Sequence, residues 1–326
     1  MVKFLIIRLS SIGDIVLTTP VVRCLKQQVE DAEIHYLTKK QNQGIIASNP
    51  YVSKVHVFEG DLDKTIAELK TEQFDYVIDL HNNLRSLIIK RKLKSLAFSF
   101  PKLNFKKWLL TAFKINRMPD VHIVDRYLQT VMPFDIKNDG LGLDFFIPDN
   151  DIFDFSGLPQ PFQNGYVAFI IGGMHKTKQL SLEKIVYVLD SLKKPVLLLG
   201  GPDDQARGDE ITKATSATVI NMCGKYSLNR SASIVKQARV VITHDTGLMH
   251  VAAAFKKKIV SVWGNTVPEF GMYPYKADES SLIVEVKGLK CRPCSKLGYD
   301  KCPKGHFYCM NRIDEKLIID FINNYY

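Results

Sequence analysis

The sequence has no long apolar run, although 46% of its 326 residues are hydrophobic. Uninterrupted apolar segments such as Val196–Leu199 are far shorter than the ~20 residues that cross a bilayer as a helix. The N-terminal residues Val2–Arg8 also lack the longer apolar core and the small-residue cleavage site of a secretory signal. We therefore expect a cytoplasmic protein without a transmembrane helix, long enough to form two domains that each bury a core.

Cysteine is also scarce. Two of the six cysteines stand alone, and four lie near the end of the chain, at Cys291, Cys294, Cys302 and Cys309. A disulfide framework is not expected in a reducing compartment. One Cys-x-x-Cys pair with two further thiols could form a tetrahedral Zn²⁺ site remote from catalysis, but a second such pair is missing. We expect reduced thiols packed in a loop, with structural zinc as the alternative.

Acidic residues are absent between Arg85 and Arg117, and the ten Lys and Arg residues of this stretch equal the net charge of +10 of the whole chain. Aromatic residues interleave with them, namely Phe98, Phe100, Phe105, Trp108 and Phe113. This mixture suits an anionic membrane surface or a phosphorylated lipid head group. A solvated basic helix pair with core-facing aromatics is the alternative. Binding to nucleic acid is not expected, because no DNA- or RNA-binding motif accompanies the charge.

Candidate strands alternate with helical stretches along the chain, and no internal repeat is visible. In the first half, strands are expected at Phe4–Arg8, Glu33–Leu37, Val55–Phe58 and Tyr76–Leu80. A polar stretch, Pro148–Gly165, is expected to be a linker. After it, strands are expected at Tyr166–Ile171, Val196–Leu199, Thr218–Asn221, Val240–Thr243 and Ile259–Trp263. Thr18–Val29 is expected to be a helix, and the apolar spacing predicts a final amphipathic helix within Ile313–Tyr326. This alternation indicates an α/β fold with two Rossmann-like, doubly wound domains facing across a cleft, residues 1–155 and 156–326.

The loop after the first strand contains Gly13 and Asp14. It lacks the Gly-x-Gly-x-x-Gly fingerprint, since Gly13 is its only glycine, and this disfavours a dinucleotide-dependent dehydrogenase. In parallel sheets ligands bind at the carboxyl ends of strands, where this loop must lie. A following helix N-terminus would keep Asp14 ionised, so that it could act as a general base. An ordinary helix-capping aspartate is the alternative.

The strand Val240–Thr243 leads into a more specific motif, His244-Asp245-Thr246-Gly247-Leu248-Met249-His250. The helix that follows begins with free backbone N–H groups at Thr246, Gly247 and Leu248, which offer a place for a diphosphate. A second glycine-bearing turn, residues 172–178, places His175, Lys176 and Lys178 after another strand. Basic side chains at that position suit a phosphate leaving group.

Together these segments resemble glycosyltransferase family 9, the lipopolysaccharide core heptosyltransferases, whose fold is of the two-domain GT-B type. Ser10-Ser11-Ile12-Gly13-Asp14 resembles the family's Ser-x-x-Gly-Asp loop, in which the aspartate is taken as the catalytic base. Residues 245–250 resemble its Asp-Thr-Gly-x-x-His signature, and Lys178 falls where the family places a basic residue that contacts phosphate. The resemblance thus implies donor binding by Lys178, Asp245, Thr246, Gly247, Leu248 and His250.

Two further segments, residues 79–86 and 122–127, resemble family patterns of the acceptor domain, which implies that Arg85 and Arg126 bind the acceptor. Gly13, in the first loop, would let the backbone approach a ligand and is expected to bind the acceptor as well. The chain departs from the family in two places. Asn229 stands where a glutamate that binds the donor ribose often follows Ser-Leu, and Leu180 stands where an aromatic residue is common. We expect Asn229 to bind the donor in place of that glutamate. Because of these departures, the sequence defines the nucleotide and the sugar of the donor less closely than it defines the reaction class.

The resemblance implies an inverting transfer of heptose from ADP-heptose, without metal or other cofactor, to the anionic inner core of lipid A-linked lipopolysaccharide. The enzyme would lie peripherally on the cytoplasmic face of the inner membrane. In GT-B folds the last helix often crosses back to the first domain, and the final helix of this chain could do the same. Two alternatives stay open: a family member that uses another sugar nucleotide on a different surface glycan, and a non-catalytic glycolipid-binding homologue.

Overall fold

The computed structural model describes residues 1–326, which divide into two compact units. The first unit comprises Met1–Leu103 and Val121–Phe146, and the second comprises Asn104–Asp120 and Ile147–Tyr326. The division therefore falls at Phe146 rather than at residue 155, and residues 104–120 group with the second unit. No helix combines the length and the apolar character that crossing a bilayer demands.

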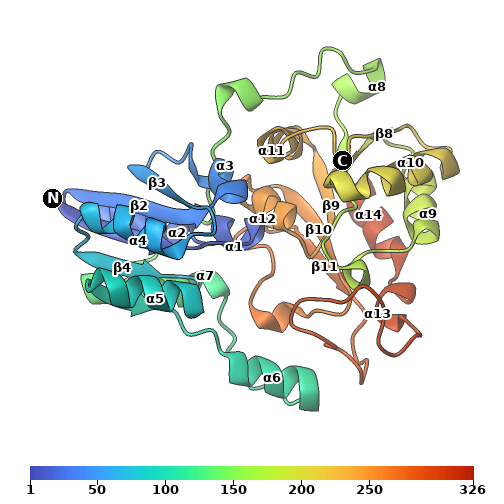
Figure 1. Cartoon of the computed structure of the whole chain (residues 1–326). Helices are drawn as coiled ribbons and strands as arrows, with labels where there is room; N and C mark the ends of the chain where they lie inside the picture. The colour runs from blue at the N-terminus through green and yellow to red at the C-terminus, as the bar shows by residue number, and fades with distance from the viewer. The chain divides into compact units, whose positions relative to one another are not determined.

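The first unit is built on a five-stranded, fully parallel sheet with the strand order β3-β2-β1-β4-β5. Its strands are β1 (Val2–Ile7), β2 (Ala32–Lys39), β3 (Lys54–Phe58), β4 (Tyr76–Asp79) and β5 (Leu96–Ser99). Its helices are α1 (Ile12–Val16), α2 (Thr19–Gln28), α3 (Gln43–Ile46), α4 (Leu62–Thr71), α5 (Leu84–Leu93) and α7 (Ile123–Leu128), with short 3-10 turns η1 (Lys40–Asn42) and η2 (Met132–Phe134). In the central strand β1, the run Phe4–Ile7 is apolar and fully buried, as expected for a strand of a doubly wound sheet that is covered on both faces (Figure 1).

A buried arginine ties the returning segment, residues 121–146, to the first unit. Arg23 on α2 is only 2% exposed, and its Nε and Nη2 donate to the two carboxylate oxygens of Asp139 at 2.6 and 2.9 Å. Asp144 pairs with Nη1 of the same side chain. Because a buried guanidinium needs fixed partners, this bidentate contact specifies where the segment crosses α2.

The second unit contains a six-stranded parallel sheet in the order β11-β10-β9-β6-β7-β8. Its strands are β6 (Val167–Ile170), β7 (Val196–Leu199), β8 (Val219–Asn221), β9 (Val240–His244), β10 (Lys258–Trp263) and β11 (Leu282–Glu285). Its helices are α6 (Asn104–Phe113), α8 (Gln160–Gln163), α9 (Leu182–Leu192), α10 (Gln205–Ala214), α11 (Leu228–Gln237), α12 (Gly247–Ala254), α13 (Tyr308–Asn311) and α14 (Glu315–Tyr325), with 3-10 turns η3 (Asp149–Asp151), η4 (Lys176–Lys178), η5 (Pro202–Asp204) and η6 (Pro268–Phe270). The loops after β6, β9 and β10 therefore meet at one edge of this sheet.

The sequence pattern does not show where the expected linker and the final helix pack. The expected linker packs on the second unit, because Phe153 is buried against Tyr226 and its backbone N–H donates to Ser233 Oγ at 3.0 Å. The final helix α14 packs against α9 of the same unit, with Ile318 and Ile322 fully buried in its core.

All nine expected strands are present within one or two residues of their predicted bounds, and the expected helix in Thr18–Val29 is α2. The α/β class with two doubly wound parallel sheets is confirmed. The strands β5 and β11 were not predicted. Each is short, lies at a sheet edge and has partly exposed side chains, so it lacks the continuous apolar run of a central strand.

Candidate functional site

In the first unit, Asp14 lies on α1, directly after the carboxyl end of β1, and is paired with an arginine. The carboxylate oxygen Oδ2 of Asp14 forms an ion pair with Arg8 Nη2 at 2.7 Å and accepts from Ser11 Oγ at 2.9 Å. The backbone N–H of Ser11 donates to the same oxygen at 3.2 Å. Oδ1 has no hydrogen bond, so one oxygen of Asp14 is held while the other remains able to accept a proton.

Arg8 is 7% exposed, and its guanidinium has further partners besides Asp14. Its Nη1 donates to the Leu80 carbonyl at 2.6 Å and to the Tyr127 hydroxyl at 3.1 Å, and its Nε donates to the Ser10 carbonyl at 2.7 Å. Burial alone would raise the pKa of Asp14, but the charge of Arg8 and the hydrogen bonds from Ser11 outweigh it and lower that pKa. Asp14 is therefore an ionised carboxylate at neutral pH.

Asp14 also completes the cap of α1. Ser11 is the N-cap residue, and Asp14 at the third helical position bonds back to it, which is a capping box. Asp14 is therefore a helix-capping residue, which is the alternative that the sequence leaves open. It also forms an ion pair with Arg8, which an ordinary helix cap does not need. Gly13 is buried in the same helix, between the cap and the carboxylate.

The other predicted acceptor residues of the first unit differ in exposure. Arg85 is exposed in the first turn of α5, with its guanidinium 5.8 Å from the centre of the Phe58 ring. Arg126 on α7 is 2% exposed, and this burial lowers its pKa. The turn that leads to Arg85 is organised by the fully buried Asp79, which accepts from the backbone N–H groups of His81 and Asn82 at 3.0 and 2.6 Å.

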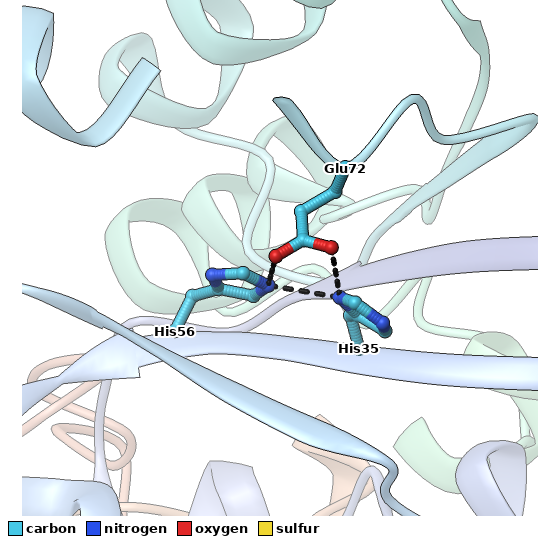
Figure 2. Close-up of side chains that lie close together, drawn as sticks. All are labelled: His35, His56 and Glu72. Atoms are coloured by element: carbon cyan, nitrogen blue, oxygen red, sulfur yellow. Dashed lines mark hydrogen bonds and ion pairs between the residues drawn. The ribbon is translucent and has the colours of Figure 1, made fainter. Parts of the chain in front are cut away.

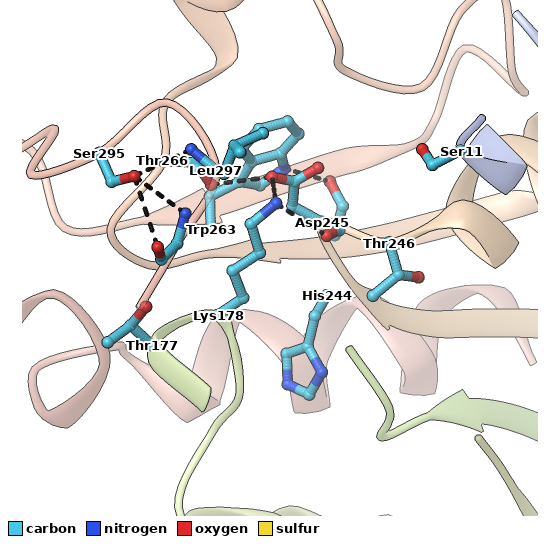
Figure 3. A network of polar contacts seen from close by, with 12 residues as sticks. Ser11, Thr177, Lys178, His244, Asp245, Thr246, Trp263, Thr266, Ser295 and Leu297 are labelled. Carbon is cyan, nitrogen blue, oxygen red and sulfur yellow. Dashed lines mark hydrogen bonds and ion pairs between the residues drawn. The ribbon is translucent and has the colours of Figure 1, made fainter. Parts of the chain in front are cut away.

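In the second unit, the loops after β6, β9 and β10 bring together Lys178, Asp245 and Thr266 (Figure 3). Lys178 Nζ lies 2.6 Å from Asp245 Oδ2, and the Thr266 hydroxyl donates to the same oxygen at 2.8 Å. Both side chains of the ion pair are only 12–15% exposed. Because the ammonium is held by a fixed carboxylate, its position is defined before any ligand arrives.

The helix α12 begins beside this ion pair. Its N-cap residue is Thr246, whose side chain caps no backbone N–H group. The first amides of a helix have no acceptor within the helix, so those at Thr246, Gly247 and Leu248 are available to an anion. All three residues are partly exposed, whereas His250, one turn further, is 2% exposed. The structure therefore brings Lys178, Asp245, Thr246, Gly247 and Leu248 together at the sheet edge and packs the His250 side chain inside.

His244 begins the motif of residues 244–250, and although the sequence assigns it no role, it fixes the loop that carries Lys178. Its Nε2 accepts the backbone N–H of Leu180 at 3.0 Å, joining the end of β9 to the segment after η4. Burial and, secondarily, the charge of Arg207 lower the pKa of His244 to about 3. The imidazole is thus neutral and holds this bond at neutral pH.

Asn229 lies at the second position of α11 and contacts a carboxylate. Its Nδ2 donates to Asp151 Oδ2 at 3.1 Å, and the Ser227 hydroxyl donates to Asp151 Oδ1 at 3.2 Å. The Oδ1 atom of Asn229 is buried and has no hydrogen-bond partner. Asp151 was not predicted, because it falls in the segment that the sequence indicates as a linker.

The four clustered cysteines are free thiols, and their segment supports the donor-side loops. Burial first, and the other thiols second, raise the pKa of Cys309 to about 11. Arg292 Nε donates to the Gly264 carbonyl at 2.6 Å, and the Tyr299 backbone N–H donates to Thr177 Oγ1 at 2.8 Å. The cysteine segment thus holds both the β10 loop and the turn beside Lys178. Reduced thiols packed in a loop stay the prediction, with structural zinc at these thiols as the alternative.

The basic stretch is divided between the two units. Its part in the first unit exposes Arg91, Lys92 and Lys94 at the end of α5. In the second unit, the α6 residue Phe105 and the adjacent Trp108 are 68% and 48% exposed, with ring centres 5.8 Å apart. The alternative of core-facing aromatics therefore does not describe α6, although Phe100 is buried.

Comparison with known proteins gives the family. Residues 63–299 match the profile of glycosyltransferase family 9 (heptosyltransferase). The chain is 24% identical over 323 residues to lipooligosaccharide heptosyltransferase 2 of Haemophilus influenzae, covering 91% of this chain and 93% of that protein. Among solved structures, a family 9 glycosyltransferase from Veillonella parvula superposes with a TM-score of 0.79 at 20% identity, covering 99% of this chain and 96% of that one.

The ADP-heptose lipopolysaccharide heptosyltransferase II of Escherichia coli superposes with a TM-score of 0.77 at 19% identity, covering 99% of this chain and 98% of that one. The GT-B fold and the glycosyltransferase class expected from the sequence are thereby confirmed. The family match covers well over half of the chain and includes Lys178 and residues 245–250. The chain therefore belongs to glycosyltransferase family 9.

Proposed function

We propose that this enzyme transfers heptose from ADP-heptose to the anionic inner core of lipid A-linked lipopolysaccharide, with inversion at the anomeric carbon. The observation that carries the proposal is the ion pair between Lys178 and Asp245 beside the free amides of α12. The heptosyltransferase names of the relatives, one of which specifies ADP-heptose, support the choice of donor.

The donor diphosphate would lie against residues 246–248. Its negative charge is favoured by the helix N-terminus, and Lys178 would donate to a phosphate oxygen. Asp245 acts here as a positioning residue, because its carboxylate holds the side chains of Lys178 and Thr266 in place. Its negative charge also offsets part of the positive charge of Lys178. As the bond between the anomeric carbon and the diphosphate breaks, these donors stabilise the growing charge on the leaving group.

Asp14 would act on the acceptor. Its Oδ1 takes the proton from the acceptor hydroxyl as that oxygen bonds to the anomeric carbon and the nucleoside diphosphate departs from the opposite face. Arg8 keeps Asp14 ionised and holds Oδ2, which leaves Oδ1 as the oxygen that receives the proton. We place Gly13, Arg85 and Arg126 on the acceptor side of the reaction.

We further infer that Asp151 binds the donor ribose in this chain. Asn229 supplies no carboxylate, but it donates to Asp151 and so presents one on the neighbouring turn η3. The Asn229 Oδ1 atom, which is buried without a partner, would gain one from a ribose hydroxyl. This arrangement supports retention of ribose recognition despite the departure from the family pattern.

We also propose that the basic stretch binds the anionic acceptor or the cytoplasmic face of the membrane that carries it. The exposed aromatic residues of α6 would insert at the level of the lipid head groups, while Lys106 and Lys107 on the same helix face anionic lipid. The cationic end of α5 would add electrostatic attraction that weakens with salt.

Incubation with a panel of sugar nucleotides and an isolated lipopolysaccharide precursor tests this function. We expect transfer with ADP-heptose and a larger thermal stabilisation by ADP-heptose than by uridine or guanosine diphosphate sugars. Transfer from a different donor would favour the alternative of another surface glycan. Binding without transfer or hydrolysis of any donor would favour a non-catalytic homologue.

A further inference from the structure

Two buried histidines and a glutamate converge in the first unit, apart from the residues assigned above (Figure 2). His35 Nδ1 lies 2.9 Å from His56 Nε2, while Glu72 Oε2 lies 3.9 Å from His35 Nδ1 and Glu72 Oε1 lies 4.0 Å from His56 Nε2. The two histidines are 1% and 8% exposed. The contacts to Glu72 are too long for hydrogen bonds, so the carboxylate faces the imidazole nitrogens without bonding to either.

The strand register explains why these side chains meet. In the pairing of β2 with β3, His35 is opposite Lys54 and Leu37 is opposite His56, so the two histidines share one face, two residues apart. Glu72 directly follows α4, which covers that face. Phe74 packs edge-on against both imidazoles and closes one side of the group.

The carboxylate of Glu33 determines the tautomer of His35, and so which of its ring nitrogens has a free lone pair. Glu33, two residues earlier on the same face of β2, lies with Oε1 2.8 Å from His35 Nε2. An ionised carboxylate only accepts, so Nε2 carries the proton and Nδ1 presents its lone pair toward His56 and Glu72. This carboxylate–histidine arrangement is the one that orients metal-ligating histidines in proteins.

We propose that His35, His56 and Glu72 form a binding site for a divalent transition-metal ion such as Zn²⁺. The ligands would be His35 Nδ1, His56 Nε2 and one oxygen of Glu72. These three ligand atoms all lie within 4.8 Å of one another. Ligands at ~2.0–2.1 Å from a shared tetrahedral ion are roughly 3.3 Å apart. The two imidazole nitrogens, now 2.9 Å apart, would therefore separate slightly, and the Glu72 carboxylate, whose nearest oxygens are 3.9 and 4.0 Å away, would move toward them by at least roughly 0.6 Å. The ion takes the place of the proton that His56 Nε2 otherwise donates to His35.

The ligand set and its surroundings define the class of ion. Two imidazoles and one carboxylate suit zinc and its first-row neighbours rather than Mg²⁺ or Ca²⁺, which prefer oxygen. His56 and Glu72 also line a surface hollow of about 700 Å³ between β3 and α4. Water can reach a fourth coordination position from that hollow.

This site is structural or regulatory rather than catalytic. Glu72 follows the carboxyl end of α4 and accepts through its backbone carbonyl from Lys3 Nζ at 3.3 Å, which places it near the beginning of β1. Asp14 instead follows the end of β1. A metal ion here would cross-link β2, β3 and α4 without contacting the acceptor-side residues.

Lys54 competes with a metal for Glu72. Its Nζ lies 2.5 Å from Glu72 Oε1, but its side chain is 56% exposed and can turn into solvent. Lys3 lies farther away, at 4.0 Å from Oε2. Replacement of Lys54 by Gln should therefore strengthen metal binding, because it removes the cation nearest to the site.

The test uses the full chain without a histidine tag, stripped of metal with a chelator and reduced. Zn²⁺ is titrated by calorimetry, and Co²⁺ is titrated with absorption spectroscopy, for the parent, His56→Gln, Glu72→Gln and Glu33→Gln. Glu68→Gln is the matched control, because Glu68 lies on α4 and lines the same hollow. Circular dichroism verifies that each variant is folded.

We expect one ion per chain at this site, with a cobalt spectrum of nitrogen and oxygen ligands. Glu33→Gln should weaken binding about tenfold, and His56→Gln and Glu72→Gln should weaken it more, while Glu68→Gln leaves it unchanged. Absence of binding, or binding that survives both His56→Gln and Glu72→Gln, would overturn the proposal. A thiolate-to-cobalt charge-transfer band as the only signal, lost in Cys294→Ser, would also overturn it, because the ion would then be held by the cysteines.

Discussion

Arg8 Nη2 lies 2.7 Å from Asp14 Oδ2, and this contact makes Asp14 an ionised carboxylate with one oxygen left open. The pair joins the end of β1 to α1 across the turn that carries Ser11. A capping box would need only Ser11 and Asp14. The arginine therefore indicates that the charge state of Asp14, and not only the helix end, is controlled.

Arg8→Met should shift the pH dependence of catalysis. With Arg8 present, the pKa of Asp14 is lowered, so the base is ionised down to pH values below the usual range of an aspartate. Without it, burial raises that pKa, and kcat/KM should decline as the pH falls from 8 to 5. Arg8→Lys, which keeps the charge, is the control. An acid limb at the same pH in the parent and in Arg8→Met would contradict this account.

Lys178→Met should lower kcat/KM by about 10²–10³-fold, the usual effect of removing one donor from a developing anion. Lys178→Arg keeps a cation near Asp245 and should retain activity within about tenfold. Lys176→Met is a matched control, because Lys176 is exposed on the same turn η4. Steady-state kinetics of all three variants decide the matter. Equal losses in Lys176→Met and Lys178→Met would contradict a specific role for Lys178.

Asp151→Asn should weaken binding of the nucleoside diphosphate about tenfold, because a neutral amide accepts a ribose hydroxyl less strongly than a carboxylate does. Asp154→Asn, a charge-matched change three residues away on an exposed side chain, should leave the affinity unchanged. Calorimetric titration with ADP measures both. Unchanged affinity in Asp151→Asn would place ribose recognition elsewhere.

The sequence could predict the central strands, because each carries three or more nearly consecutive apolar residues, as Phe4–Ile7 and Val240–Ile242 do. It could also predict that residues 245–248 and Lys178 lie at strand ends. It could not predict the contact between Lys178 and Asp245, since 67 residues separate them and only the neighbouring places of β6 and β9 bring them together. Asp151 gave no signal, because its segment has the polar composition of a linker.

Protein stability should fall in acid partly through His244. Its pKa is about 3 in the folded chain and ~6.5 when unfolded, so the unfolded chain binds the additional proton between these values. Its contribution is complete above pH ~6.5 and declines as the pH drops, by ~2 kcal/mol from pH 7 to 5. Denaturant unfolding of the parent and His244→Gln should show a shallower pH dependence in the variant. Parallel pH dependences would exclude this role.

Membrane binding should depend on α6 as well as on charge. The double substitution of Phe105 and Trp108 by Ser should reduce co-sedimentation with acidic liposomes severalfold, because both side chains are exposed. Leu141→Ser, which changes an exposed apolar residue of the first unit, is the control. Binding of the parent should also decline with salt, since the Debye length is ~10 Å at 0.1 M. Binding that is insensitive to salt and to the double substitution would contradict the proposed contact.

The central claim is that Asp14 is the base in heptosyl transfer, and the initial rate of transfer from saturating ADP-heptose in Asp14→Asn tests it most directly. The asparagine is close in size and can maintain the cap of α1, but it cannot take up the acceptor proton. We expect the rate to fall by ~10²–10⁴-fold while ADP affinity and the melting temperature stay near those of the parent. A rate within about tenfold of the parent would contradict the assignment.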